Sequence, residues 1–256
     1  MRGKMDKTPV MYITEQMEQM QKWITEHYGE SDSYLVHEIV SEYVHTDVQI
    51  AVLPDRARNF VTFGMGARKM NAPEEALERV ELVMSASPAL ELQSERGMSL
   101  LGELTAMSKF PFRKDTWLGP GHTLPLSDRF RDTFGYDCAL LVPDEEVVHI
   151  PEIGPVCFLR VIPIYRDERE WIMENGSFLY ADYLYGKIGE KMFWMDQPRE
   201  HFIPDEDEVM DVALMRVLGV NRSKLEKLQI FLTDAEISGE EMSYERILQW
   251  LEDNKD

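Results

Sequence analysis

The sequence predicts an α+β fold in which a mixed or antiparallel sheet is flanked by helices and followed by a mainly helical, acidic C-terminal extension. Three observations predict this class. Segments with the two-residue period of strands gather early in the chain, and helical segments precede, separate and follow them. Strands and helices do not alternate regularly, as they would in a parallel βαβ sheet. After residue 195, both the periodicity and the charge of the chain change.

The first predicted elements are an amphipathic helix and a pair of strands. Apolar residues recur at spacings of three and four over residues 13–28, and Gly29 is a typical helix stop. Alternating polar and apolar residues over 43–52 predict a half-buried strand. A proline–aspartate turn at 54–55 leads to a second predicted strand over 58–65, so we expect a hairpin.

The middle of the chain changes period several times. Residues 74–86 look helical at their start and strand-like at their end, and we favour a strand over 79–85. Helical spacing follows over 97–110 and is expected to end at Pro111. Frequent glycine and proline then predict a region rich in loops. Two mostly apolar segments predict buried strands, at residues 138–142 and 156–165.

The last part of the chain predicts helices only. Residues 166–175 form a short helical pattern that Gly176 ends, and 177–185 continue as another helix. Asp205 and Ser243 are suitable N-cap residues for two further helices, because their side-chain oxygens can accept from the first free N–H groups.

The charge divides the chain into two parts. The segment 204–208 combines a proline with four carboxylates and precedes a new helical pattern. Residues 196–256 contain 16 acidic and 7 basic residues. We therefore expect a main domain over residues 1–195 and an acidic C-terminal extension over residues 196–256.

Composition limits the classes of partner. The 256 residues carry 27 Lys and Arg against 47 Asp and Glu, a formal net charge of −20. This charge repels nucleic acids and attracts basic proteins. No apolar run is long enough to span a bilayer, and the N-terminus lacks the apolar stretch of a secretory signal. Cys138 and Cys157 lie in apolar runs, so we expect free buried thiols in a cytoplasmic protein that binds no membrane.

The sequence contains no standard catalytic motif. It lacks a phosphate-binding loop, a dinucleotide fingerprint, a nucleophile elbow and paired zinc cysteines, and we predict no cofactor. The best cluster for chemistry is His37, Glu38, His45, Asp47 and His122. His45 and Asp47 project from one strand face and His122 lies in a flexible loop, so these three could hold the metal of a hydrolase. Alternatively, such residues only form hydrogen bonds on a covered strand face.

Arg160 is unusual because it interrupts an apolar strand. If that strand is central, the guanidinium group needs a partner. Glu81 and Asp47 also interrupt apolar strands, so we expect one of them to pair with Arg160 and set the strand register. The alternative is that Arg160 binds a ligand. With such a pair, Arg160→Met leaves folding nearly intact, whereas loss of either carboxylate is destabilising.

Several blocks resemble one known family in the same order. They include HEIVS at 37–41, VHTDV at 44–48 and FVTFGMGARKMNAP at 60–73. RVELV at 79–83, DTWLGPGHTL at 115–124 and FLRVIPIY at 158–165 continue the order. Over about residues 30 to 185 the chain resembles the Suppressor of fused (SUFU) domain, in particular its bacterial branch.

The resemblance implies a SUFU-type α+β fold that binds proteins without catalysis. In the animal family members, a short peptide of Gli-type transcription factors lies in a groove between two domains and joins as an added strand. Bacterial relatives are regarded as immunity proteins that neutralise toxins. This chain lacks the long second domain of the animal proteins, so the resemblance does not transfer their groove.

Three functions follow as hypotheses. The first is a SUFU-type protein-binding module, an immunity-like inhibitor or sequestering protein for a basic partner such as a toxin, or for a peptide added as a strand. The second is the metal-dependent hydrolase, and the third is an adaptor that sequesters a basic protein without any toxin. The expected binding surface combines the loop 119–124 with the polar face of the first strand. Its candidate residues are His45, Asp47, Glu81, Gly121, His122 and Arg160.

Overall fold

A computed structural model describes residues 7–39, 41–53, 57–237 and 243–254. The elements are α1 (Thr14–Tyr28), β1 (Glu30–Val36), β2 (Asp47–Leu53), β3 (Ala57–Phe63), η1 (Met65–Ala67), β4 (Val80–Ala86), α2 (Glu95–Lys114), β5 (Thr123–Pro125), α3 (Asp128–Phe134), β6 (Cys138–Ile150), β7 (Gly154–Ile164), α4 (Arg166–Asn175), α5 (Ser177–Ile188), η2 (Gly189–Phe193), α6 (Glu206–Leu218), α7 (Arg222–Ile237) and α8 (Tyr244–Asp253). Here η marks a 3₁₀ helix.

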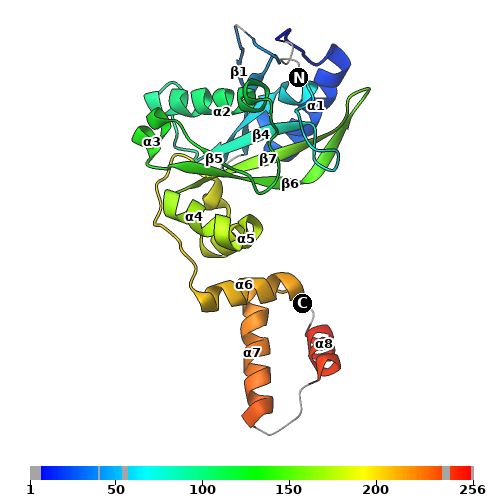
Figure 1. Cartoon of the computed structure of the whole chain (residues 1–256), viewed down its shortest axis with the longest axis vertical. Helices are drawn as coiled ribbons and strands as arrows, with labels where there is room; N and C mark the ends of the chain where they lie inside the picture. Colours follow the sequence, from blue (N-terminus) through cyan, green and yellow to red (C-terminus); the bar gives the residue numbers. More distant parts are fainter. Residues whose placement is uncertain (1–6, 40, 54–56, 238–242, 255–256) are drawn as a thin grey trace.

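A seven-stranded mixed sheet organises the described chain, in the order β1-β2-β3-β4-β7-β6-β5 (Figure 1). Neighbouring strands are antiparallel except β4 and β7, which are parallel. The α+β class with a mixed sheet is therefore confirmed. Helices cover both faces of this sheet, as its largely apolar strands require. The hairpin of β2 and β3 is confirmed, and its expected turn at 54–55 lies outside the described residues.

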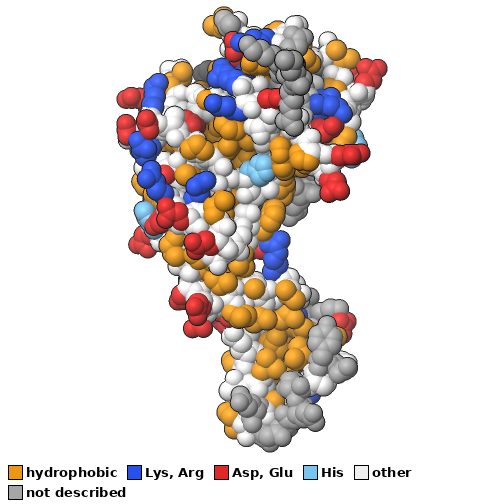
Figure 2. Space-filling model, viewed as in Figure 1, with side chains coloured by type: hydrophobic (Ala, Val, Ile, Leu, Met, Phe, Trp, Pro, Cys, Tyr) orange, Lys and Arg blue, Asp and Glu red, His pale blue; other side chains and the backbone are white. Residues whose placement is uncertain are grey.

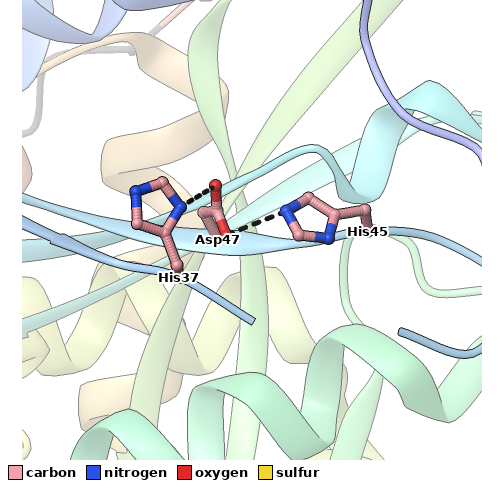
Figure 3. A group of neighbouring side chains, drawn as sticks. All are labelled: His37, His45 and Asp47. Atoms are coloured by element: carbon pink, nitrogen blue, oxygen red, sulfur yellow. Dashed lines mark hydrogen bonds and ion pairs between the residues drawn. The ribbon is translucent and has the colours of Figure 1, made fainter. Parts of the chain in front are cut away.

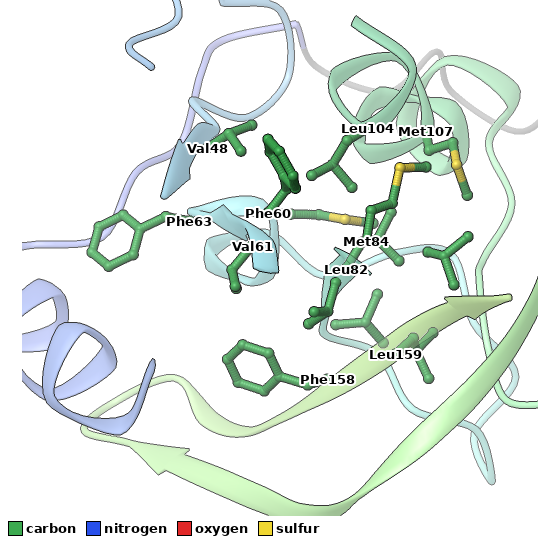
Figure 4. Close-up of a cluster of buried hydrophobic side chains, with 14 of the residues drawn as sticks. Val48, Phe60, Val61, Phe63, Leu82, Met84, Leu104, Met107, Phe158 and Leu159 are labelled. Carbon is green, nitrogen blue, oxygen red and sulfur yellow. The ribbon is translucent and has the colours of Figure 1, made fainter. Parts of the chain in front are cut away.

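The core lies on both sides of the sheet. Figure 4 shows Leu104 and Met107 of α2 packed near Phe60 and Met84. On the opposite face, Trp23 of α1 stacks on Phe158 of β7 at 4.1 Å between ring centroids. A second apolar cluster joins β6 and β7 to α4 and α5. Both cysteines are buried and free, as the sequence predicts.

Most helices and strands begin and end within a few residues of the predicted positions. Gly29 ends α1 with a φ of 104°, and the side chains of Asp205 and Ser243 cap α6 and α8. The first predicted strand begins later than expected, at Asp47, because Tyr43 has a φ of 69°. It is also buried on both faces rather than half-buried, because α1 and α2 cover both sides.

The helix α2 does not end at Pro111 but continues to Lys114. Phe112 in this last turn is buried in the core, and Asp115 then ends the helix in the left-handed conformation. The burial of Phe112 favours an additional helical turn despite the hydrogen bond that proline cannot make.

The helices α6–α8 project away from the sheet beyond α4 and α5 (Figure 1). Figure 2 shows apolar side chains gathered on the visible surface of this extension. Residues 196–202, in contrast, are bonded to the main body: the Asp196 carboxylate accepts from Ser87, and Arg199 pairs with Glu168. The division of the chain into two domains stays a prediction, and these contacts favour a boundary after Phe202. No described helix is long and apolar enough to cross a membrane.

Candidate functional site

His37, Asp47 and His45 form a compact polar cluster where the chain passes from β1 to β2 (Figure 3). The Nδ1 atom of His37 lies 3.1 Å from Asp47 Oδ2, and the Nε2 atom of His45 lies 3.1 Å from Asp47 Oδ1. His37 directly follows β1, and Asp47 is the first residue of β2. The antiparallel pairing of the two strands therefore brings His37 beside the other two residues.

A buried ion pair between Lys109 and Glu38 lies next to this cluster. The ammonium group of Lys109 in α2 donates to Glu38 Oε2 at 2.7 Å and to the carbonyl of Val44 at 2.5 Å. The same Glu38 oxygen accepts from Ser41 Oγ at 2.9 Å and from the Thr46 N–H group at 3.0 Å. Burial lowers the pKa of Lys109, against the opposing effect of Glu38. These bonds hold the β1–β2 connection against the core.

The cluster borders a small cavity of about 180 Å³. Apolar side chains of Met11, Met17 and Phe63 line the rest of this cavity. Asp47 has only 9% of its side chain exposed, whereas His37 has 68% exposed. The site is thus a polar group at the wall of an apolar hollow, with His37 on the solvent side.

His122 does not belong to this cluster, so the expected hydrolase site of His45, Asp47 and His122 is not formed. His122 precedes β5 at the opposite end of the sheet from β1. Its ring lies edge-on to Trp117 at 4.2 Å between centroids, and burial lowers its pKa. The neighbouring Gly121 donates its N–H to the carbonyl of Leu141. The loop 119–124 and the cluster therefore lie next to opposite edges of the sheet.

Glu81 does not pair with Arg160, which corrects the expected ion pair. Its carboxylate is completely buried and accepts from Tyr12 Oη at 2.9 Å and from Thr62 Oγ1 at 2.6 Å. It also accepts from the N–H groups of the turn at residues 64–66, at 2.9–3.2 Å. Burial raises the pKa of Glu81 to about 7, although its hydrogen bonds oppose this shift. The residue closes a turn inside the core and touches no solvent.

Gly64 makes this turn possible. It has a φ of 120°, and a Cβ atom there would lie 2.2 Å from the carbonyl oxygen of His45. Both the positive φ and this close approach require glycine. Gly64 directly follows β3, which ends at Phe63.

Arg160 faces a groove instead of a buried carboxylate. Its guanidinium group lies 3.5 Å from the centroid of the Phe193 ring and pairs with Glu190 at 3.2 Å. The groove has a volume of about 670 Å³ and runs between the end of α1 and η2. Asp47 is likewise not its partner, since that carboxylate faces the two histidines.

We expect the Arg160→Met variant to unfold with a free energy within about 1 kcal/mol of the wild type. Glu190 is largely exposed, so its ion pair is screened by water, and methionine can replace the contact with Phe193. Urea denaturation monitored by circular dichroism checks this. A loss of more than about 3 kcal/mol would indicate instead that the guanidinium group satisfies a buried charge.

A second hollow lies beside the edge strand β1. Neither this hollow nor β1 was predicted from the sequence. It has a volume of about 460 Å³ and lies between β1, β2 and the start of α2. Most of its lining is apolar, from Val36, Ile50, Leu92, Met98 and Leu101. We call these five residues the edge cleft. Met98 is 53% exposed, so part of the apolar lining of the cleft is open to solvent.

The chain segment that contains β1 has an acidic sequence. Residues 26–42, which contain β1, include five glutamates and aspartates and no lysine or arginine. Two charged residues, Glu91 and Arg58, also line the cleft. The guanidinium group of Arg58 donates to the carbonyl of Leu90. The sequence signal for this surface is the run of acidic residues, which becomes meaningful only once β1 is known to be an edge.

Comparisons with known proteins give one family. A family model described as Suppressor of fused protein (SUFU) matches residues 43–188. The crystal structure of the Sufu–Fu complex is similar with a TM-score of 0.56 and 12% identity, over 80% of this chain and 98% of that chain. The search of curated proteins finds no match.

Two further solved structures are similar. Drosophila Suppressor of Fused has a TM-score of 0.56 and 13% identity over 82% of this chain, which spans 55% of the Drosophila chain. A SUFU homologue from Neisseria gonorrhoeae FA 1090 has a TM-score of 0.49 and 13% identity, over 76% of this chain and 98% of that chain.

Proposed function

Because this chain belongs to the Suppressor of fused family, whose model matches more than half of it, we propose that it is a non-catalytic module that binds another protein. The fold is shared with a relative whose structure was determined as a complex, the Sufu–Fu complex. The open edge of the sheet beside an apolar cleft is the observation that carries the proposal. An extended partner segment adds to β1 and places an apolar side chain in the edge cleft.

The edge supplies the backbone bonding for this partner. β1 is the outermost strand of the sheet, and its described residues pair with β2 on one side only. An edge strand leaves a row of N–H and C=O groups that an extended segment can bind. The opposite edge is less suitable, because β5 has only three residues and ends in Pro125.

The edge cleft supplies affinity and selectivity. Val36 is the last residue of β1 and lines the cleft, so a segment paired with β1 runs past the cleft. Burying one large apolar side chain there contributes about 1.5–3 kcal/mol. Strand addition with a side-chain pocket is a general mode of peptide recognition.

Charge supports a basic partner. The segment 26–42 contains five acidic residues, of which Glu38 pairs with Lys109 and Glu42 with Lys7, and the whole chain has a net charge of −20. Opposite charge accelerates encounter and makes it depend on salt. An immunity-like inhibitor of a basic toxin fits this pattern, as does an adaptor that sequesters a basic protein.

The test begins with identification of the partner. A photo-crosslinking amino acid at position 98 in the full chain captures what binds the edge cleft in the native cells, and mass spectrometry identifies it. Binding of the purified partner is then measured by calorimetry. A toxin whose activity is inhibited on binding supports the immunity role, whereas a basic protein without toxic activity supports the adaptor role.

We expect Met98→Glu to weaken binding of that partner at least about tenfold, because it places a charge in the edge cleft. Met173→Glu is the matched control, since Met173 is an exposed methionine on α4, away from β1. This control variant should bind like the wild type. Equal binding by both variants, or equal loss in both, would contradict the proposed surface.

A further inference from the structure

We propose that His37, His45 and Asp47 bind one divalent transition-metal ion, for which zinc is the best match. Each residue offers one ligand atom, and the three atoms lie within 4.8 Å of one another. Two imidazole nitrogens and one carboxylate oxygen suit zinc, whereas magnesium and calcium prefer oxygen ligands alone. This inference goes beyond the proposed partner binding and does not depend on it.

The nitrogen–oxygen distances of the cluster are close to those between the ligands of a zinc ion. Zinc bonds of about 2.0–2.1 Å in a tetrahedron place ligand atoms about 3.3 Å apart. Both histidine nitrogens lie 3.1 Å from an oxygen of Asp47. The two imidazoles lie on either side of the carboxylate and face different oxygens of it (Figure 3). Only the exposed side chain of His37 has to adjust.

The groups behind the ligands have the arrangement that metal sites use. Ser41 Oγ lies 2.7 Å from His45 Nδ1, so the other ring nitrogen, Nε2, is left to face the ion. The Glu38 N–H group donates to Asp47 Oδ1 at 3.0 Å and holds the carboxylate in place. Such outer contacts orient the ligands and typically strengthen metal binding about 10–100-fold.

The charged groups around the cluster are also compatible with a bound cation. Lys109 is the nearest buried cation in the network, and Glu38 already neutralises it at 2.7 Å. Asp47 carries the remaining negative charge, and its only charged contacts among the described residues are the two histidines. The cavity that Met11, Met17 and Phe63 also line adjoins the three ligands, so a water molecule there would complete a four-coordinate site.

The bound ion would connect the end of the edge strand to the start of its neighbour. His37 is the residue after β1, and Asp47 is the first residue of β2. Metal binding should therefore hold the connection between these strands and raise the melting temperature of the chain. The role assigned to the ion is structural, and no reaction is assigned to it.

The experiment is calorimetric titration of zinc chloride into the full, untagged chain after removal of metals with EDTA. We expect one ion per chain, with a dissociation constant of about 1 μM or tighter. His37→Ala and His45→Ala should each weaken binding at least about 100-fold. His37→Ala is the safer variant, because its exposed side chain makes few core contacts. His149→Ala, an exposed histidine on β6, is the matched control and should bind zinc normally.

A second measurement identifies the ligands. Cobalt(II) added to the metal-free chain should give the visible absorption of a tetrahedral site with nitrogen and oxygen ligands, and His37→Ala should abolish it. Absence of saturable binding at one equivalent would overturn the proposal, and so would unchanged zinc affinity in both histidine variants. Because these measurements need no partner protein, they separate this proposal from that of the edge cleft.

Discussion

Replacing Glu81 by alanine is expected to lower the free energy of unfolding by about 3–5 kcal/mol. The completely buried carboxylate accepts from two hydroxyl groups, of Tyr12 and Thr62, and from the N–H groups of residues 64–66. Alanine leaves these donors buried without an acceptor and opens a cavity among them. The loss does not arise from an unpaired Arg160, whose partners lie in the groove.

Equilibrium denaturation in urea measures this effect. Glu78→Ala is the matched control, because Glu78 lies three residues earlier and forms an exposed ion pair with Lys69. The control should change the free energy of unfolding by no more than about 0.5 kcal/mol. A small effect of both substitutions would show that the turn does not need the carboxylate.

The same residue adds a pH dependence. The pKa of Glu81 is raised from 4.5 to about 7 in the folded chain, so the folded state binds its proton more tightly than the unfolded state does. Its contribution to stability is therefore complete below about pH 4.5 and is lost as the pH rises to about 7. Glu81→Gln removes this titration. The free energy of unfolding of the wild type should fall relative to Glu81→Gln by roughly 3 kcal/mol over this interval. A constant difference would contradict the shifted pKa.

Replacing Arg199 by methionine is expected to cost about 3–5 kcal/mol of unfolding free energy. Arg199 binds the completely buried Glu168 through both guanidinium nitrogens, with the second bond at 2.8 Å, and it also donates to the carbonyl of Pro163. Burial lowers the pKa of Arg199, but the hydrogen bonds that Arg199 donates to Glu168 outweigh this effect and raise the pKa, so the guanidinium group stays charged. Methionine would leave the charge of Glu168 buried without a cation.

Two further variants identify the cause of that loss. Arg216→Met removes an ion pair with Asp182 that is half exposed, so it should cost no more than about 0.5–1 kcal/mol. The double variant Glu168→Leu with Arg199→Met should recover much of the stability that Arg199→Met loses, because no charge remains buried. If the double variant is no more stable than Arg199→Met alone, the unpaired charge is not the cause.

Many of the helices and strands could be predicted from the sequence. The helices α1, α4 and α5 and the strands β3, β4 and β7 follow from spacing, glycine stops and caps, which depend on near neighbours. The strand β1 was missed because its residues, ESDSYLV, lack a clear alternation of polar and apolar side chains. The parallel pairing of β4 with β7 has no local signal, since it joins residues far apart in the chain.

The candidate sites could be predicted from the sequence only in part. The sequence predicts His45 and Asp47 on one strand face. His45 in fact precedes β2, which begins at Asp47, but its Nε2 atom still lies 3.1 Å from Asp47 Oδ1. Of the predicted cluster, His37 lies beside Asp47 because the antiparallel pairing of β1 and β2 brings it there, whereas His122 lies next to β5 at the other edge of the sheet. The edge cleft could not be predicted without β1.

The sequence by itself determined the α+β class, the family resemblance, the acidic charge and the burial of both thiols, because these depend on composition and on the order of side chains. Only the tertiary structure decided which groups face Glu81, Asp47 and Arg160 and which strand forms the edge. Those outcomes depend on how the helices pack on the two faces of the sheet. Each buried polar group then bonds to whatever donor or acceptor that packing places within reach.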